Sequence, residues 1–197
     1  MKLLLATKNK HKVEEMRALL RDLPQVEVVS AADFPEVEEP EETGETFLDN
    51  ARLKARHYAG ATGLMALADD SGLVVDALGG RPGVMSSRYG VDDAARIARL
   101  LDELRDTPDT DRTARFECAM VLAQPEAEGD AAATRGTLEG NIAREARGTN
   151  GFGYDPVFHL PERGLRLAEL SADEKNAVSH RGNALREMVK ALREIVG

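Results

Sequence analysis

Two short runs of consecutive apolar residues constrain the fold of this chain more than any other feature. Residues 3–6 (Leu-Leu-Leu-Ala) and 64–68 (Leu-Met-Ala-Leu-Ala) each pass directly into polar sequence. Uninterrupted apolar runs of this length predict buried strands. Between them, apolar residues recur at helical spacing over 12–20, and the apolar pattern of a strand returns over 26–29. We therefore expect the chain to open as strand, loop, helix, strand.

Apolar patterns typical of helices and of strands continue to the end of the chain. Residues 148–156 are an exception, because they hold too many turn-forming residues for a regular element. No internal repeat and no long linker interrupts the sequence, which predicts a single domain over 1–197. Helices are expected over 47–58 after a Thr46 cap, over 97–104 after an Asp92 or Asp93 cap, over 171–179 with a Ser171 cap and over 185–196; strands are expected over 73–75, 113–123 and 134–142.

Composition excludes several classes of protein. With 197 residues and 42% hydrophobic content, the chain is long enough to bury a core. A net charge of −9 and a pI near 5.0 argue against broad binding to nucleic acid, so any phosphate site must be local. The single cysteine, Cys118, lies in an alternating run that predicts an interior position. The N-terminal apolar run is too short for a signal peptide and no later segment approaches a membrane span, so we expect no membrane association and a cytoplasmic location.

A basic loop follows the first apolar run. It lies between a predicted strand and a predicted helix, so its backbone N–H groups and its lysines can face an anion. It matches neither a P-loop nor a Rossmann loop. A phosphate site and a solvated basic turn remain equally good interpretations of this loop taken alone. Its residues are Thr7, Lys8, Asn9, Lys10, His11 and Lys12.

The second apolar run stops at Asp69-Asp70-Ser71-Gly72. Carboxylates at the end of a strand suit Mg²⁺, which takes oxygen ligands and bridges substrate phosphates. Alternation along a strand lets only one of the two aspartates face a cleft. Glu41 or Glu42 can supply a second carboxylate, although a solvated acidic loop is the better interpretation of 36–42 alone. A metal ion would also allow a triphosphate to approach these acids.

Two further segments contain candidate binding residues. The glycine-rich loop 151–156 carries Phe152, which can stack on a base, and Asp155, which can accept hydrogen bonds from it. Lys175 and the predicted turn at 179–182 add cations before the last helix, where His180 and Arg181 can donate to a 6-oxo group and disfavour a 6-amino group. Taken alone, an aromatic plug is at least as good an interpretation of Tyr154, and a surface turn is the better interpretation of 179–182.

Six motifs in register carry a resemblance to a known family. Together they strongly resemble the inosine triphosphate pyrophosphatase family over nearly the whole chain. The motifs are Thr7-x-Asn9-x-x-Lys12, Glu41-Glu42-Thr43-Gly44-x-Thr46-Phe47, Ala68-Asp69-Asp70-Ser71-Gly72-Leu73, Leu78-Gly79-Gly80-x-Pro82-Gly83, Phe152-Gly153-Tyr154-Asp155-Pro156 and Ser179-His180-Arg181-Gly182. One departure is Met85, which stands where the family commonly has an aromatic residue.

The resemblance implies a fold and a reaction. The implied fold is α/β, an elongated mixed β-sheet with flanking helices that forms two lobes around a central cleft. The implied protein is a homodimer that requires Mg²⁺. The implied reaction cleaves inosine, deoxyinosine and xanthosine triphosphates into the nucleoside monophosphate and pyrophosphate.

The resemblance also implies roles for individual residues. The loop from Thr7 to Lys12 would hold the triphosphate, and Ser71 would contact the substrate. Asp70 would be the catalytic acidic residue that activates water and, with Glu41, a metal ligand. Glu42 and Asp69 would support them, and Lys54 would reach the phosphates. The base and sugar pocket would comprise Phe152, Gly153, Tyr154, Asp155, Lys175, His180 and Arg181.

The expected mechanism uses Mg²⁺ to activate a water molecule that attacks phosphorus while lysines neutralise the departing pyrophosphate. A nucleotide sensor that binds without hydrolysis is the main rival, and the paired acids disfavour it. A phosphohydrolase that forms an aspartyl-phosphate is a weaker rival, since that chemistry usually needs an Asp-x-Asp arrangement that the sequence does not offer at 69–71.

Overall fold

The computed structural model describes residues 1–196, the side chain of Val196 excepted. The chain divides into two compact units, each built from several pieces of sequence. The first unit comprises Met1–Asp70, Cys118–Gly136 and the residues from Arg181 onward, and the second comprises Ser71–Glu117 and Thr137–His180. Each unit is described by itself below.

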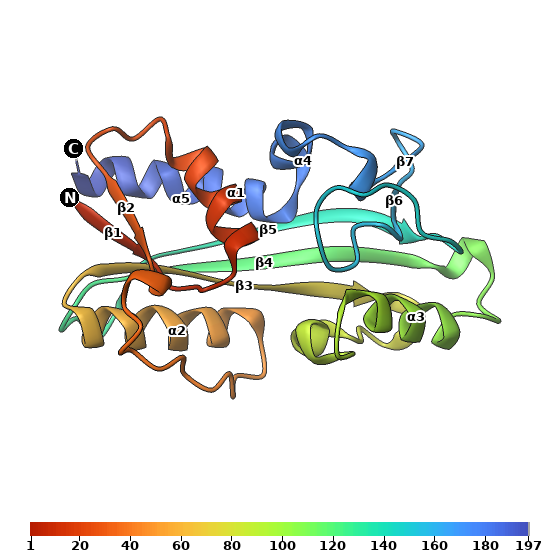
Figure 1. Cartoon of the computed structure of the whole chain (residues 1–197), viewed down its shortest axis with the longest axis horizontal. Coiled ribbons are helices and arrows are strands. Elements are labelled where there is room, and N and C mark those ends of the chain that lie inside the picture. Colours follow the sequence, from red (N-terminus) through yellow and green to blue (C-terminus); the bar gives the residue numbers. More distant parts are fainter. Residues whose placement is uncertain (197) are drawn as a thin grey trace. The chain divides into compact units, whose positions relative to one another are not determined.

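Seven strands and five α-helices make up the regular structure (Figure 1). The strands are β1 (Lys2–Leu5), β2 (Glu27–Ser30), β3 (Met65–Val75), β4 (Thr113–Ala123), β5 (Asp130–Ile142), β6 (Phe158–Leu160) and β7 (Leu165–Arg166). The helices are α1 (Lys10–Leu20), α2 (Phe47–Thr62), α3 (Asp93–Glu103), α4 (Ala172–Val178) and α5 (His180–Val196). Short 3₁₀ turns occupy 31–33, 76–78, 83–88, 109–111 and 167–169.

The strands form one mixed sheet in the order β2-β1-β3-β4-β5-β6-β7. β1 pairs with β2 and with β3 in parallel, which is the pairing that the predicted strand, helix, strand opening requires. β6 is antiparallel to β5 and to β7. The predicted α/β class with a mixed sheet and flanking helices is therefore confirmed.

In the first unit, β1 is buried on both faces. Leu3 and Leu5 pack into one apolar cluster with α1 and α5, whereas Leu4 and Ala6 pack into another with α2. Figure 1 shows α1 and α5 on one face of these strands and α2 on the other. This arrangement explains the uninterrupted apolar run, because successive side chains of a strand point to opposite faces.

The second unit has its own apolar cluster. Leu73 and Val75 of β3 pack there with Leu100 of α3 and with Phe116 and Phe158. The buried Arg112 fastens the start of β4 to this unit, since its guanidinium donates to the carbonyls of Ile142 (2.7 Å) and Ala143 (3.2 Å) and to that of Leu104.

Most predicted elements are confirmed, together with their caps. Thr46, Asp92 and Ser171 each accept a backbone hydrogen bond at the start of α2, α3 and α4 respectively. The segment 148–156 contains only turns and bends, and Cys118 is buried, as expected. Within residues 1–196, no helix is long and apolar enough to cross a membrane.

Three boundaries differ from the predictions. β3 continues through Asp69 and Asp70 instead of stopping before them. β5 begins at Asp130, four residues before the strand predicted over 134–142. His180 and Arg181 form the first turn of α5 and are buried, so the prediction of a turn there is wrong.

Candidate active site

Asp69 and Asp70 are both buried within β3 and face opposite sides of the sheet. Asp69 points to the same face of β3 as Leu67, which packs with α1 and α5. Asp70 points to the same face as Ala68, which packs with α2. Their partners agree with this alternation, because Asp69 contacts cations from α1 and α5 and Asp70 contacts side chains of α2. The two neighbouring acids therefore belong to two different polar networks.

Asp69 joins two cations. Its Oδ2 lies 3.0 Å from Lys12 Nζ and accepts hydrogen bonds from Arg181 Nη2 (3.0 Å) and Nε (3.2 Å). Arg181 Nη1 also donates to Glu15, at 2.6 Å. Burial alone would raise the pKa of Asp69, but the charges of Lys12, Arg181 and Lys54 outweigh it and hold that pKa far below its usual range. The ionised form of Asp69 is therefore favoured, and it binds one cation in the first turn of α1 and one in the first turn of α5.

Asp70 lies in a different electrostatic setting. Its Oδ1 accepts from Lys54 Nζ at 3.1 Å and its Oδ2 accepts from Asn50 Nδ2 at 3.2 Å. Burial raises the pKa of Asp70; Lys54 and Lys12 oppose this rise and Glu42 adds to it, so that the pKa stays above its usual value. A carboxylate with a raised pKa is a better proton acceptor near neutral pH.

Lys54 connects Asp70 to the acidic segment at 36–42. Its Nζ donates to Glu42 Oε1 at 2.8 Å, so one ammonium group bridges two carboxylates. Burial lowers the pKa of Lys54, but the charges of Asp70, Asp69 and Glu42 outweigh burial and raise it. Asn50 makes a second link, because its Oδ1 accepts from the backbone N–H of Gly44 at 2.8 Å. Asp70, Lys54 and Glu42 thus form one group, in which two carboxylates share a single ammonium and Asp70 and Lys54 are buried.

The donor set around Lys54 fits a hard divalent cation. Glu42 and Asp70 direct carboxylate oxygens at one point, where a positive charge already lies. Within residues 1–196 no group of three His, Cys, Asp or Glu side chains is placed to hold a metal, so such an ion would take part of its coordination from water and phosphate, as Mg²⁺ usually does. The carboxylate paired with Lys54 is that of Glu42, and Glu41 is exposed.

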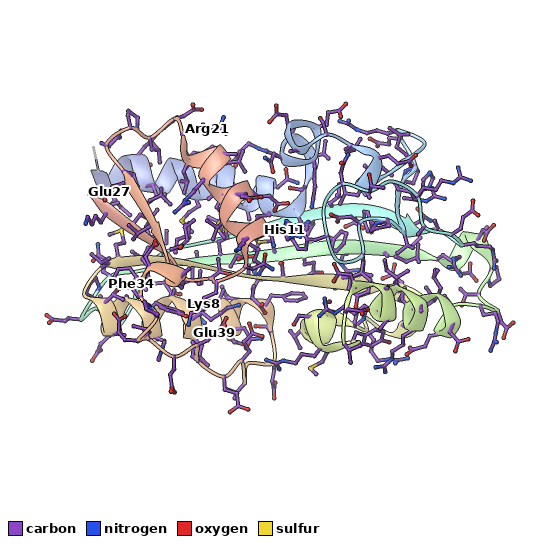
Figure 2. All side chains as sticks on the ribbon, in the orientation of Figure 1. Lys8, His11, Arg21, Glu27, Phe34 and Glu39 are labelled. Atoms are coloured by element: carbon purple, nitrogen blue, oxygen red, sulfur yellow. The ribbon has the colours of Figure 1, made fainter. Side chains whose placement is uncertain are left out.

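The basic loop is organised around its own helix cap. Asn9 Oδ1 accepts from the backbone N–H groups of His11 (3.0 Å) and Lys12 (3.3 Å), and α1 begins at Lys10. Lys8 Nζ donates to the carbonyl of Val37 at 3.2 Å. In Figure 2, Lys8 lies on the side of the acidic segment, whereas His11 projects from the first turn of α1.

The exposure of this loop matches a binding role. Thr7 is buried and its Oγ1 accepts from the Asn9 N–H at 3.2 Å, which fixes the start of the loop. Lys8, Lys10 and His11 are exposed. The first turn of α1 contains no acidic residue. The loop therefore presents positive charge at a helix N-terminus, which is the arrangement that attracts phosphate.

In the second unit, the aromatic loop is built around Asp155. Asp155 Oδ2 accepts from the N–H of Phe152 (2.9 Å) and from Lys175 Nζ (2.6 Å), and the same Nζ lies 4.5 Å from the centre of the Phe152 ring. Gly151 has φ +74, and a Cβ there would lie 2.1 Å from Asp155 Oδ2. The sequence therefore needs glycine at 151 to let the loop close on the carboxylate.

Two further hydrogen bonds fix the rest of the loop. Gly153 N–H donates to Asp93 Oδ2 at 2.7 Å, which ties the loop to the start of α3. The hydroxyl of Tyr154 donates to the carbonyl of Ser86 at 2.9 Å, and Tyr154 is buried. Tyr154 therefore plugs the core of this unit, which was one of the two interpretations that the sequence left open.

His180 packs as an aromatic ring. Its imidazole stacks on Phe116 with ring centres 4.7 Å apart and an angle of 11° between the planes. His180 is buried, whereas Ser71, on β3, is half-buried.

The structure thus gathers the predicted residues into two groups. In the first unit, Lys12, Asp69 and Arg181 form one network and Lys54 and Asp70 another. In the second unit, Phe152, Asp155 and Lys175 form a single cluster. Arg181 is therefore bound to Asp69 of β3 and to Glu15 of α1, an attachment that the motif at 179–182 does not reveal.

Sequence reasoning missed several supporting residues. Asn50 lies one helical turn before Lys54 on α2, and a polar pair at this spacing among buried alanines was a usable signal. Glu15 stands three residues after Lys12 on α1, a spacing that places both on one side of the helix. Phe116 and Asp93 carried no local signal, because their partners are distant in sequence.

Comparison with known proteins shows which family this chain resembles. The model of the Ham1 family matches residues 3–191. A dITP/XTP pyrophosphatase of Shigella flexneri is 48% identical over 195 residues, which cover 98% of this chain and 98% of that protein. A protein of the same name from Bacillus cereus is 49% identical over 192 residues, covering 96% and 93% respectively.

Solved structures agree with the sequence relatives. The structure of a HAM1 protein from Coxiella burnetii has a TM-score of 0.90 and 47% identity, covering 98% of this chain and 99% of that one. The Ham1 protein of Staphylococcus aureus has a TM-score of 0.87 and 36% identity, with the same coverage. These matches confirm the resemblance carried by the six sequence motifs. The chain belongs to the Ham1 family.

Proposed function

We propose that this protein hydrolyses nonstandard purine nucleoside triphosphates, namely dITP, XTP and ITP, to the nucleoside monophosphate and pyrophosphate. Relatives at 48% and 49% identity over nearly the full chain are named dITP/XTP pyrophosphatase. The observation that carries the proposal is the group formed by Asp70, Lys54 and Glu42, because it combines a buried carboxylate of raised pKa with a cation and a second carboxylate.

The reaction needs a water molecule, a proton acceptor and charge neutralisation. Water attacks the α-phosphorus, the bond from that phosphorus to the bridging oxygen breaks, and pyrophosphate leaves. Asp70 accepts the proton of the attacking water, a role that its raised pKa favours. The lysines of the loop from Thr7 to Lys12 neutralise the triphosphate. Most of the acceleration is then electrostatic and positional.

Asp70 and Glu41 are the proposed ligands of Mg²⁺, and Glu42 is positioned to assist because it already shares a cation with Asp70. When bound, the ion supplies positive charge against the phosphates and acidifies water. In the structure, Lys54 donates hydrogen bonds to both Asp70 and Glu42. We assign Lys54 to the phosphates of the substrate when the ion is bound.

Selection of the base is assigned to residues of the second unit, together with Arg181 of the first. Phe152 offers a ring for stacking, and Gly153, Tyr154, Asp155 and Lys175 shape and charge the loop around it. His180 and Arg181 donate hydrogen bonds to a 6-oxo group, which hypoxanthine and xanthine have and adenine lacks. Arg181 also donates to Asp69 and Glu15, which fixes the position of its guanidinium. Ser71 is assigned to the substrate beside Asp70.

The proposal also covers the location, the oligomeric state and the partners of the enzyme. We assign it to the cytoplasm, as a homodimer that acts on free nucleotides and binds neither nucleic acid nor membrane. The net charge of −9 supports the exclusion of nucleic acid, since phosphate backbones attract basic surfaces.

Pyrophosphate release tests the proposal. Wild-type protein is incubated with ITP or with ATP, first with Mg²⁺ and then with a chelator; rapid release from ITP with Mg²⁺ alone is the expected result. The variant Asp70→Asn should lower turnover by about 10²-fold or more, whereas Asp102→Asn, at an exposed acid of α3, should leave it unchanged. Binding of ITP without any pyrophosphate release would favour a nucleotide sensor.

A further inference from the structure

Phe116 is placed by the alternation of β4. In the first part of this strand, Ala114, Phe116 and Cys118 are buried while the residues between them are more exposed. Phe116 joins the apolar cluster of the second unit, where only 6% of its surface is exposed. Its ring is therefore held by the sheet and not by a loop.

Phe116 has two aromatic neighbours on different elements. On one side the His180 imidazole stacks almost parallel to it, with centres 4.7 Å apart and 11° between the planes. Phe158 of β6 packs at 4.6 Å with an angle of 42°. The buried Phe116 ring presents a fixed surface to the imidazole, because interior side chains have little room to rotate.

The backbone of His180 is also restrained. Ser179 ends α4 and its N–H donates to the Lys175 carbonyl at 2.8 Å, and His180 begins α5 in the next position. With the backbone set by two helices, the remaining freedom of His180 is rotation of its side chain. The stacked Phe116 ring restricts that rotation, since both side chains are buried and close-packed interiors leave little room for a ring to turn.

We infer that Phe116 is a positioning residue for base recognition, which acts by fixing the plane of the His180 imidazole. This inference rests on the proposed function, in which His180 donates to a 6-oxo group. A hydrogen bond weakens steeply as its angle departs from linear, so the plane of the ring decides how well it reads that oxygen. Phe116 then influences selectivity without contacting the nucleotide.

The experiment compares three variants that alter the same apolar cluster. Phe116→Leu and Phe116→Met remove the stacked ring, and methionine retains most of its volume. Phe158→Leu is the matched control, because it removes a buried ring that packs on Phe116 and leaves Phe116 against His180. Each is made alone and together with His180→Gln, and kcat/KM is measured for ITP and ATP with Mg²⁺. Thermal unfolding of every variant reports loss of structure separately.

We expect both Phe116 variants to lower the ratio of kcat/KM for ITP to that for ATP by about tenfold. Phe158→Leu should lower thermal stability at least as much and change the ratio by less than about twofold. With His180→Gln already present, Phe116→Met should change the ratio no further, because coupled residues are not additive.

Two results would overturn the inference alone: an unchanged ratio in the Phe116 variants, or an equal loss of ratio with and without His180. A wild-type protein that hydrolyses ITP no faster than ATP would overturn the proposed selectivity, and the inference with it.

Discussion

Asp69 and Asp70 are neighbours in sequence, yet strand alternation gives them opposite surroundings and opposite pKa directions. Two cations close to Asp69 lower its pKa, so its ionised form stabilises the fold. Burial raises the pKa of Asp70, so its ionised form lowers the stability of the metal-free protein. One acid thus supports the structure, and the other has the raised pKa on which its proposed role in hydrolysis rests.

Replacing each acid by its amide should separate these roles. Asp69→Asn leaves Arg181 and Lys12 without their buried carboxylate and should lower the free energy of unfolding by about 3–5 kcal/mol. Asp70→Asn should leave that free energy unchanged or raise it. Urea titrations of both variants in chelator provide the measurement. A larger loss of stability in Asp70→Asn than in Asp69→Asn would contradict the assignment.

Two buried tyrosines allow a similar comparison. Among residues 1–196 the buried Tyr58 hydroxyl has no hydrogen-bond partner, whereas the Tyr154 hydroxyl donates to the carbonyl of Ser86. Tyr154→Phe leaves a buried carbonyl without its donor and should cost about 1–3 kcal/mol. Tyr58→Phe should cost less than about 0.5 kcal/mol, or stabilise. Thermal unfolding decides this, and equal costs for the two changes would show that the Tyr58 hydroxyl has a stabilising contact.

Cys118 gives a prediction about reactivity. Burial raises its pKa to about 12, with Asp69 adding to the rise. The thiolate is the reactive form, so the native protein should react with a thiol reagent at pH 8 far more slowly than the unfolded protein. Rapid labelling of the native protein would mean that this part of β4 opens readily.

Arg112 links the start of β4 to neighbouring elements, because its guanidinium donates to three backbone carbonyls. It donates to Leu104 after α3, to Ile142 at the end of β5 and to Ala143. Arg112→Lys replaces a planar fork by a point charge and should destabilise by about 2–4 kcal/mol. Arg144→Lys is the matched control, because the exposed Arg144 bonds to Asp109 and to nearby carbonyls at the surface. Similar losses in the two variants, measured by urea unfolding, would refute this role.

Elements governed by local pattern could be predicted from the sequence. β1, β4 and the caps at Thr46, Asp92 and Ser171 follow from periodicity and from side-chain oxygens that accept backbone hydrogen bonds.

Elements governed by distant charges could not. β3 was expected to stop at Asp69 because a buried carboxylate is costly. It continues because Lys12, Lys54 and Arg181, from three helices, supply compensating charge. The same attachment draws Arg181 into the first turn of α5, where a turn was predicted. The alternation of the two aspartates was predictable, whereas their partners required the fold.

At the scale of the whole molecule, neither unit is a single stretch of sequence. β3, β4 and β5 each contribute residues to both units. The group around Asp70 belongs to the first unit, and the cluster around Phe152 and Asp155 belongs to the second. The proposed reaction assigns the phosphates to residues of the first unit, and the base to residues of the second unit and to Arg181 of the first.

A competition experiment followed by ³¹P NMR tests this account most directly. An equimolar mixture of ITP and ATP is incubated with the wild-type protein and Mg²⁺, and the phosphorus signals of substrates and products are recorded over time. The account predicts loss of ITP, equal growth of inosine monophosphate and pyrophosphate, and ATP left intact. Growth of orthophosphate or a nucleoside diphosphate, or equal consumption of ATP, would contradict it.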